Sequence, residues 1–532
     1  MSSPLFLGLD SSTQSLKATA VDAELNVVFE LALNFEKDLP QFNTTAGVHH
    51  GEDGLTVTSP TLLWVAAMDL LLGRMKEAGF EFGRVKAISG SGQQHGSVYW
   101  KKGASGILRN LAPAESLESQ LADAFAIANS PIWMDSSTSA QCKALEEKLG
   151  GPQAVADLTG SRAYERFTGN QIAKVAVEKK EGYENTERIS LVSSFVACLF
   201  TGAYAGIDYS DGAGMNLMDI RSKTWAPVAV EATAPGLADK LGEVVPSHAD
   251  VGGIHNYHVE RYGFDPSCRV IACSGDNPCS LAGLGLRRAG EIAISLGTSD
   301  TVFAALSEPK PSASEGHIFA NPIDPDGYMA LVCYKNGSMT REDIRNRAAD
   351  GSWEKFDAAM ASTPKGNEGR IGFYRKEPEI TPPILSTGEN RFDAHDAAVD
   401  SFPPEAEIRA VVEGQFLSMR LHGGNIGIEA QQILATGGAS ANKAILQVIA
   451  DVFGVEVYTA ARPNSASLGA AYRALHGWRC VDEGKFVSFA EIMESAPSFI
   501  LAASPDMEAH EVYNSMLKRY AALEVKVMAA AK

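Results

Sequence analysis

The feature that most constrains this chain is a β-hairpin pattern that occurs twice, once near the start of each half. The first copy lies at residues 5–22, where two apolar strands flank a polar turn. The second lies at residues 291–306 and has the same order of strand, turn and strand. Apolar runs of this length and alternation are typical of β-strands. The repetition predicts a duplicated architecture with two lobes.

Both turns offer groups that bind phosphate. The first has an acid, Asp10, at the end of its strand, and the second has a glycine, Gly297, where the backbone can approach an anion. The candidate phosphate-binding residues are Asp10, Thr13, Gln14, Gly297, Thr298 and Ser299. Asp10 is also a candidate Mg²⁺ ligand, because a carboxylate at a strand end can hold a divalent cation. Taken alone, the first turn is better explained as an ordinary hairpin with a polar loop.

Length and charge narrow the class of protein. A chain of 532 residues is too long for one core and predicts two large domains with insertions. Lysine and arginine number 46 against 65 acidic residues, for a net charge of −19. This balance argues against nucleic acid and anionic membranes as partners, although a local basic pocket for phosphate stays possible.

The cysteines and the apolar stretches indicate a cytoplasmic protein. The seven cysteines are scattered and lack paired metal spacing, so we expect buried thiols in a reducing compartment. No basic segment followed by an apolar one opens the sequence, so we expect no signal peptide. The longest apolar stretch, 191–207, contains polar residues and two glycines and predicts a buried helix and loop rather than a membrane span.

A change of composition predicts the domain boundary. Residues 242–265 are polar and carry glycine and proline. We therefore expect an N-terminal domain at 1–267, with the first phosphate hairpin and a sugar site. A C-terminal domain at 268–532 would hold the catalytic base, the second hairpin and an adenosine site.

Two strand ends in this chain carry polar side chains suited to a ligand. A predicted buried strand at 85–88 leads into small residues and then Gln94, His95 and Gly96, which a polar ligand could contact at the edge of an open sheet. A satisfied polar turn is the alternative.

The sharpest chemical signal follows a short strand at 270–273. Asp276, preceded by Gly275, can project from the strand end and accept a proton as a general base, and Asn277 beside it can hold a neighbouring hydroxyl. A helix N-cap by itself also explains an aspartate at this position.

In the second half, an amphipathic helix at 405–421 precedes a strand at 433–436 and the glycine pair Gly437 and Gly438. A strand, a glycine pair and then a helix make a place where adenine and ribose can lie on bare backbone, and Asn442 is a candidate contact. We expect the small-residue helix at 464–471 to pack behind this motif.

Together these motifs resemble the FGGY carbohydrate kinases, which belong to the actin and hexokinase class of ATP-binding folds. The resemblance extends along nearly the whole chain and is closest to the animal-type xylulokinase branch of that family. It implies an α/β fold with two actin-like (ribonuclease H-like) ATPase domains and an interdomain cleft. It also implies ATP and Mg²⁺ as cofactors. We expect a small-molecule sugar and ATP as partners, and a monomer or a homodimer.

The resemblance assigns roles to individual residues. Asp276 would be the catalytic base, and Trp353 would lie near the nucleotide. The residues expected to bind the sugar are Gln94, His95, Arg166, Asp276 and Asn277. Without the resemblance, Arg166 would be read as half of a surface ion pair. The segment Trp133 to Asp135 resembles the Trp-x-Asp turn of sugar kinases, but Ser137 stands where an arginine commonly follows, so Asp135 is a secondary candidate.

The implied reaction is the phosphorylation of D-xylulose by ATP to give D-xylulose 5-phosphate. One alternative is a kinase for another polyol, such as ribulose, glycerol or gluconate, because a fold does not fix the sugar. Another is a non-catalytic sugar sensor with an actin-like ATPase fold. The sequence has neither the G-x-x-x-x-G-K-[ST] loop nor a dinucleotide fingerprint, which argues against P-loop and NAD enzymes.

Overall fold

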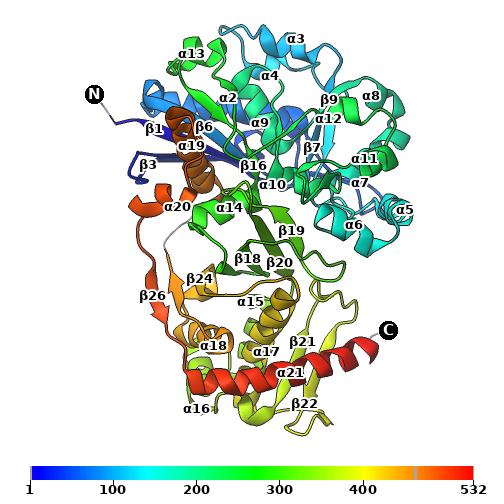
Figure 1. The fold of residues 1–532 in the computed structure, drawn as a ribbon, viewed down its shortest axis with the longest axis vertical. Coiled ribbons are helices and arrows are strands. Elements are labelled where there is room, and N and C mark those ends of the chain that lie inside the picture. The colour runs from blue at the N-terminus through cyan, green and yellow to red at the C-terminus, as the bar shows by residue number, and fades with distance from the viewer. Residues whose placement is uncertain (1–2, 461–463, 531–532) are drawn as a thin grey trace. The chain divides into compact units, whose positions relative to one another are not determined.

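A computed structural model describes residues 3–460 and 464–530 of the chain, which fold into two compact α/β units (Figure 1). Of the described residues, unit 1 comprises 3–287, 318–329 and 464–496, and unit 2 comprises 288–317, 330–460 and 497–530. Their main division falls after residue 287, whereas the sequence favours a boundary between 267 and 268. The reason is that residues 269–271 pair with a strand of unit 1 and residues 276–284 pack on a helix of unit 1.

The centre of unit 1 is a seven-stranded mixed sheet. Its strands run in the order β14-β15-β6-β1-β2-β3, with β16 also paired to β6. Their bounds are β1 Leu5–Ser11, β2 Ser15–Val21, β3 Val27–Asn34, β6 Val85–Gly92, β14 Asp250–Gly253, β15 Arg269–Ile271 and β16 Ser274–Gly275. β1, β15 and β16 are all parallel to β6. The parallel strands put their carboxyl ends at one edge, which is where open α/β sheets bind ligands.

The first predicted hairpin is confirmed, because β1 and β2 pair antiparallel. β2 also pairs antiparallel with β3, so the three strands form a meander. The strand predicted at 85–88 is longer than expected, because the small residues 89–92 continue β6 instead of turning. Gly92 leaves no room for a side chain there, since a Cβ would stand 2.5 Å from the amide nitrogen of Ser193.

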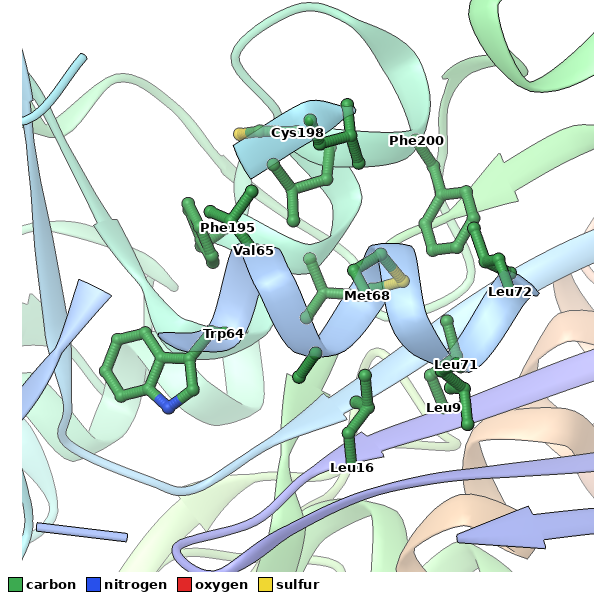
Figure 2. Packing of buried hydrophobic residues seen from close by; sticks show 14 of the residues in the cluster. Leu9, Leu16, Trp64, Val65, Met68, Leu71, Leu72, Phe195, Cys198 and Phe200 are labelled. Carbon is green, nitrogen blue, oxygen red and sulfur yellow. The ribbon is translucent and has the colours of Figure 1, made fainter. Parts of the chain in front are cut away.

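Two helices bury most of their length in the core of unit 1. They are α2 (Thr61–Glu77) and α9 (Val192–Thr201), and α9 is the buried helix predicted within residues 191–207. Figure 2 shows Trp64, Val65 and Met68 of α2 near Phe195 and Cys198 of α9. All five of these side chains are at most 2% exposed. The stability of unit 1 therefore rests on a close-packed apolar layer against the sheet.

Further helices of unit 1 surround this core. The longer ones are α5 Ser139–Leu149, α6 Pro152–Thr159, α7 Thr168–Glu178, α11 Pro227–Thr233, α13 Asn256–Tyr262 and α14 Asp276–Leu284. A short helix, α10 (Tyr209–Gly212), follows the two-residue strand β10 (Ile207–Asp208). Within residues 3–460 and 464–530, no helix is long and apolar enough to cross a membrane. All seven cysteines are free thiols, and six of them are buried.

The helix expected behind the glycine pair 437–438 lies elsewhere, and that prediction is wrong. α19 (Ser465–Glu483) belongs to unit 1, where it packs against β1 and α14. Glycines make this approach possible. A Cβ on Gly8 would stand 2.1 Å from the carbonyl oxygen of Ser467, and one on Gly469 would stand 1.8 Å from that of Cys279. The small residues at 464–471 therefore serve close packing on unit 1.

Unit 2 is built on a second sheet, six of whose strands run in the order β20-β18-β17-β24-β25-β26. Their bounds are β17 Glu291–Leu296, β18 Asp300–Leu306, β20 Tyr328–Tyr334, β24 Gln432–Thr436, β25 Val457–Thr459 and β26 Ile500–Ala503. β17 and β18 pair antiparallel, which confirms the second predicted hairpin. β24 runs parallel to β17, as β6 does to β1 in unit 1. The repetition predicted from the two hairpins thus extends to a third strand.

Residues 345–403 of unit 2 contain regular structure. They include α16 (Trp353–Ser362) and a small sheet of β21 (Ile371–Arg375), β22 (Gly388–Phe392) and β23 (Ala398–Val399). The remaining long helices are α15 Ser338–Ala348, α17 Pro404–Asn425, α18 Lys443–Phe453 and α21 Met507–Ala530. α21 packs on the rest of unit 2 through the buried side chains of Tyr513 and Tyr520.

A buried histidine ties α17 to α21 and to residue 315. The two ring nitrogens of His422 lie 2.7 Å from a carboxylate oxygen of Glu315 and 3.1 Å from one of Glu524. Burial alone would lower the pKa of His422, but the hydrogen bonds and charges of both carboxylates outweigh it and raise the pKa to about 9. The histidine is therefore charged in the folded protein at neutral pH.

This triad predicts a loss of stability at high pH. The pKa of His422 is higher in the folded state than its unfolded value of about 6.5, so its stabilisation is full below that pH and is lost as the pH rises through 9. We expect the difference in unfolding free energy between the wild type and His422→Gln to shrink by about 3 kcal/mol between pH 6 and pH 10. Denaturant unfolding at a series of pH values measures it. The exposed His395→Gln is the control, and parallel curves for wild type and His422→Gln would contradict the assignment.

Candidate active site

Three strand ends of unit 1 lie side by side at the edge of the sheet. Register pairs Asp10 of β1 with Ser91 of β6, and the same Ser91 with Ser274 of β16. The residues after β6, Gln93 to His95, and the residue after β16, Asp276, therefore start from the edge where Asp10 lies. The backbone hydrogen bond from Gln93 to Ser11 joins two of these ends. The fold thus gathers most of the sugar-site and first-hairpin candidates in one place.

Asp10 is a buried carboxylate held by hydroxyl groups. It is 4% exposed, and the hydroxyl of Ser91 donates to its Oδ1 at 3.0 Å. Burial raises its pKa, while Lys17 and the hydroxyls of Ser91 and Ser12 favour the charged form. Within the described residues, no group of three or more His, Cys, Asp or Glu side chains is placed to hold a metal. One carboxylate still suits Mg²⁺, which binds one or two carboxylates and keeps water or phosphate as its other ligands.

Asp276 occupies the first turn of α14 and is partly exposed. Its Oδ1 accepts hydrogen bonds from the amide of Asn277 at 2.9 Å and from the amide of Gln94 at 3.4 Å. The helix begins after Gly275, which is the N-cap residue, so the N-cap explanation of Asp276 does not hold. An acid in the first turn is still favoured by the helix dipole.

The electrostatics of Asp276 suit a proton acceptor. Burial, and then the nearby charge of Asp10, raise its pKa to about 7, although the amides of Asn277 and Gln94 oppose the shift. A carboxylate with this pKa is largely unprotonated just above neutral pH and is basic enough to take a proton from a hydroxyl group. Perturbed carboxyl groups of this kind cluster at functional sites.

Gln94, which follows β6, contacts Asp276 and Asn277, and the neighbouring His95 is held by other partners. Asn277 donates from its side chain to Oε1 of Gln94 at 2.8 Å, which fixes both amides. His95 has φ +70°, and its Nδ1 lies 2.9 Å from the carbonyl oxygen of Gly214. Burial, and then the charge of Arg166, lower the pKa of His95 to about 3. His95 is therefore neutral, and its Nδ1–H donating to Gly214 leaves Nε2 as an acceptor.

Arg166 lies beside the same imidazole. Its guanidinium stacks over the ring of Tyr164 at 4.9 Å and over that of Phe167 at 5.6 Å, and His95 stacks on the same Phe167 at 4.4 Å. Arg166 is partly exposed. Stacking on aromatic faces fixes the plane of the guanidinium, and the stacking contact itself does not involve the N–H donors. His95 and Arg166 are thus held together by their shared contact with Phe167.

Asp135, the secondary candidate, is occupied by its own chain. Its two carboxylate oxygens accept from the amides of Val57 and Ser137, the hydroxyl of Ser137 and the side chain of Gln171. Lys174 in turn donates to the hydroxyl of Ser137 at 2.6 Å. Asp135 is 2% exposed. These contacts give Asp135 a structural role. Lys174, which donates to Ser137, places a positive charge close to the carboxylate.

Sequence reasoning missed two buried polar side chains in this region. Asp211, on α10, is 2% exposed, and its Oδ1 has no hydrogen-bond partner within residues 3–460 and 464–530. In the same part of the chain, both side-chain atoms of Gln93 are buried and unpartnered. Gln93 directly precedes Gln94, which the sequence does single out. An acid in a run of small residues was the one available signal for Asp211.

A second candidate site lies wholly in unit 2, beside the second hairpin. A pocket of about 830 Å³ is lined by five of the residues predicted to bind the nucleotide, namely Gly297, Thr298, Trp353, Gly438 and Asn442. The other lining includes Met339, Glu342 and Asp357. This volume falls within the usual range for small-molecule sites. Trp353 is partly exposed, and the guanidinium of Arg345 lies 4.6 Å from its ring centroid.

Two predicted residues of unit 2 do not line that pocket. Gly437 has φ +81°, and a Cβ there would stand 2.5 Å from the carbonyl oxygen of Leu296. It therefore lets the end of β24 approach β17. Ser299 lies in the turn of the hairpin outside the lining. Asn442 caps α18 by accepting from the amide of Ile445 and donates to Asp357 at 2.7 Å, so its side chain orients the rim.

Comparisons with known proteins identify the family to which this chain belongs. The model of the FGGY carbohydrate kinase N-terminal domain matches residues 122–283, and that of the C-terminal domain matches residues 292–478. Mouse (Mus musculus) xylulose kinase is 55% identical over 529 residues, covering 99% of this chain and 95% of the mouse protein. The chain belongs to the FGGY family of carbohydrate kinases.

Solved structures support the fold. A xyloylose kinase from Brucella ovis has a TM-score of 0.80 at 20% identity, covering 99% of this chain and all of that one. A gluconate kinase from Lactobacillus acidophilus has a TM-score of 0.79 at 18% identity, covering 100% and 99%. The predicted two-domain α/β fold of the FGGY, actin-like type is confirmed. At such identities the likeness concerns the fold alone.

The raised pKa of Asp276 predicts a measurable effect on stability. Because its folded pKa of about 7 exceeds its unfolded value of about 3.9, the wild type loses stability as the pH rises from 4 to 7. Asp276→Asn keeps the acceptor for the two amides and removes the charge. We expect its melting temperature to exceed that of the wild type by about 1 to 3 °C at pH 8, and by less at pH 5. The exposed Asp123→Asn is the control, and an equal difference at both pH values would count against the raised pKa.

Proposed function

We propose that this chain transfers the γ-phosphoryl group of ATP to the C5 hydroxyl of D-xylulose, giving D-xylulose 5-phosphate and ADP. The observation that carries the proposal is the similarity to mouse xylulose kinase along nearly the whole length of both chains. The position of Asp276 and His95 just after strands of one sheet, and the contact of Arg166 with the aromatic ring on which His95 stacks, support it, because a sugar needs both donors and acceptors. The free cysteines support a reducing compartment, and we place the reaction in the cytoplasm.

Asp276 acts as the general base in this proposal. The hydroxyl oxygen of the sugar bonds to the γ-phosphorus, the bond from that phosphorus to the β,γ-bridging oxygen breaks, and the hydroxyl proton passes to Asp276. The amides of Asn277 and Gln94 hold Oδ1 of the carboxylate, which leaves Oδ2 for the hydroxyl. A pKa of about 7 lets the same group release the proton to solvent after each turnover.

The sugar is held by groups of complementary polarity. The neutral His95 accepts from one hydroxyl through Nε2, and Arg166 donates to sugar oxygens from its stacked position. Gln94 and Asn277 fix each other and present the rest of their hydrogen-bonding groups to the ligand. A pre-arranged set of this kind binds with little loss of side-chain freedom.

The nucleotide binds in unit 2, in the pocket lined by Trp353 and Gly438. Trp353 offers a flat face to the adenine, and Thr298 offers a hydroxyl to the phosphates. In unit 1, Asp10 and the turn with Thr13 and Gln14 contact the metal and phosphates. Mg²⁺ bound with ATP would offset negative charge on the phosphates. Trp133 donates from its indole to the hydroxyl of Thr13 at 2.8 Å, which orients that turn.

A panel of sugars tests the proposed substrate. ADP release is measured with Mg-ATP and D-xylulose, D-ribulose, L-ribulose, glycerol or gluconate. We expect D-xylulose to stimulate release by at least tenfold more than any other member of the panel. Stimulation by another polyol would keep the kinase and overturn the substrate. No stimulation by any sugar, with ATP hydrolysis that is independent of sugar, would favour a sugar sensor of the same fold.

Replacement of the base tests the proposed mechanism. We expect Asp276→Asn to lower kcat by about 10²- to 10⁴-fold, the range for loss of a general base. The Kd for D-xylulose, measured calorimetrically without ATP, is expected to change by less than fivefold, because the amide keeps the size and the acceptor. Asp123→Asn, an exposed carboxylate, should leave both quantities unchanged. A kcat close to that of the wild type would remove Asp276 from the base role.

A further inference from the structure

The indole of Trp353 contacts both the nucleotide pocket and an arginine outside that pocket. Trp353 is the first residue of α16 and lines the pocket of unit 2. The guanidinium carbon of Arg345, on α15, lies 4.6 Å from the centroid of the indole ring. Arg345 is not among the described residues that line the pocket. The indole therefore has the guanidinium as one neighbour and the space for the nucleotide as another.

One face of α15 connects the pocket to this arginine. Ser338, Met339 and Glu342 of α15 line the pocket, and Arg345 follows Glu342 by three residues. Residues three or four apart share a face of a helix, so Ser338, Glu342 and Arg345 form one stripe along α15. Arg345 thus occupies the turn of α15 directly beyond the pocket, where Trp353 lies over it.

The backbone of Arg345 holds the turn that carries Trp353. Its carbonyl oxygen accepts from the amides of Ala349 and Gly351 at 2.8 and 3.2 Å. Ser352, directly before Trp353, caps α16 with its side chain. The start of α16 is therefore tied to the end of α15 through the same residue whose side chain lies over the indole.

A second aromatic contact restrains the indole further. Phe356, three residues on in α16, is 0% exposed, and its ring meets the indole at 70° with the centroids 5.1 Å apart. Trp353 itself is partly exposed. A partly exposed side chain loses rotamer freedom when it binds a ligand, unless its neighbours fix it beforehand. Arg345 and Phe356 supply that restraint before the nucleotide binds.

On the basis of the proposed function, we propose that Arg345 is a positioning residue for the nucleotide and acts through Trp353. Its guanidinium fixes the plane of the indole as a cation–π partner, and the base of ATP stacks on the part of the ring that faces the pocket. The guanidinium is itself held, because its Nε and Nη2 donate to Oδ1 of Asn346 at 3.1 and 2.8 Å. Arg345 therefore meets the indole as a fixed plane.

Direct attraction of the ATP phosphates by Arg345 is the alternative. Gly297 and Thr298, the proposed phosphate contacts of unit 2, line the pocket, whereas Arg345 lies outside the described lining. This arrangement favours an action through the indole. The two explanations differ in one consequence. An effect through the indole disappears when the indole is removed, whereas an effect on the phosphates remains.

A double-mutant cycle tests this difference. The Kd for Mg-ADP is measured calorimetrically for the wild type, Arg345→Met, Trp353→Leu and the double variant. We expect Arg345→Met, which keeps the apolar stem and removes the cation, to raise the Kd about threefold to tenfold. In the Trp353→Leu background the same change should alter the Kd by less than about 1.5-fold. The KM for ATP should follow the Kd, while kcat and the Kd for D-xylulose stay within about twofold of the wild type.

Two further variants and one spectrum sharpen the comparison. Arg347→Met is the matched control, since it removes an arginine of α15 that pairs with Asp343 and Glu389. It should leave the Kd for Mg-ADP unchanged. Arg345→Lys keeps the charge without the planar fork and should give an intermediate Kd. In fluorine NMR of protein labelled with fluorotryptophan, the Trp353 signal, identified by its loss in Trp353→Leu, should shift in nucleotide-free Arg345→Met and stay in place in Arg347→Met.

The outcomes separate this inference from the proposed function. If Arg345→Met raises the Kd by the same factor with and without Trp353, or leaves it unchanged with Trp353 present, the positioning role is overturned and the nucleotide site remains. If Trp353→Leu leaves the Kd for Mg-ADP unchanged, the proposed nucleotide site is overturned together with the role of Arg345. If no sugar stimulates ADP release by the wild type, the kinase proposal fails, while the binding cycle still decides the role of Arg345.

Discussion

The candidate sugar site depends on one fully buried arginine. Arg473, on α19, is 0% exposed and forms an ion pair with Asp208 at 3.3 Å. Its guanidinium also donates to three carbonyl oxygens, those of Ser247, Ala272 and Pro322. Asp208 caps α10, which carries Asp211, and accepts from the hydroxyl of Ser274, two residues before Asp276. Breaking a buried ion pair of this kind costs about 3 to 5 kcal/mol. Arg473 therefore fixes the segments that carry both acids.

The same region concentrates acidic side chains whose charged forms are disfavoured by burial. Asp10, Asp211 and Asp276 all have pKa values raised by burial, and for Asp211 and Asp276 neighbouring carboxylates add to the shift. A chain selected for stability alone would replace such groups by apolar ones. For two of them, retention is explained by the roles proposed above: a cation for Asp10 and a hydroxyl proton for Asp276. The unfavourable electrostatics of the empty protein become favourable interactions with substrate.

Local patterns in the sequence carried the prediction of both hairpins, the strand ends and the position of Asp276. Each depends on a few consecutive residues, and strand periodicity and turn chemistry act at that range. The placement of α19 was wrong for the opposite reason. Its small residues could pack closely against many backbone segments. The position of α19 is set by the contact of Gly8 with Ser467, two residues that are far apart in the sequence. Likewise, no local pattern tells that Arg473 meets Asp208 or that Asp211 is left with an open oxygen. The family resemblance supplied the candidate roles of His95 and Trp353, which local chemistry does not.

The two hairpins show how similar turns can serve different ends. In the second hairpin, Asp300 is wholly buried and receives two hydrogen bonds from Arg341, at 2.6 and 3.0 Å. Arg341 is also held by Gln415, so this acid fixes the hairpin to α15 and α17. In the first hairpin, Asp10 receives hydroxyl groups instead of a cation. A carboxylate neutralised by an arginine has little attraction left for Mg²⁺, whereas one bound by hydroxyls keeps its charge for the ion. The acid of the second hairpin thus fixes the backbone of its own hairpin, whereas that of the first suits the metal role that we propose for it.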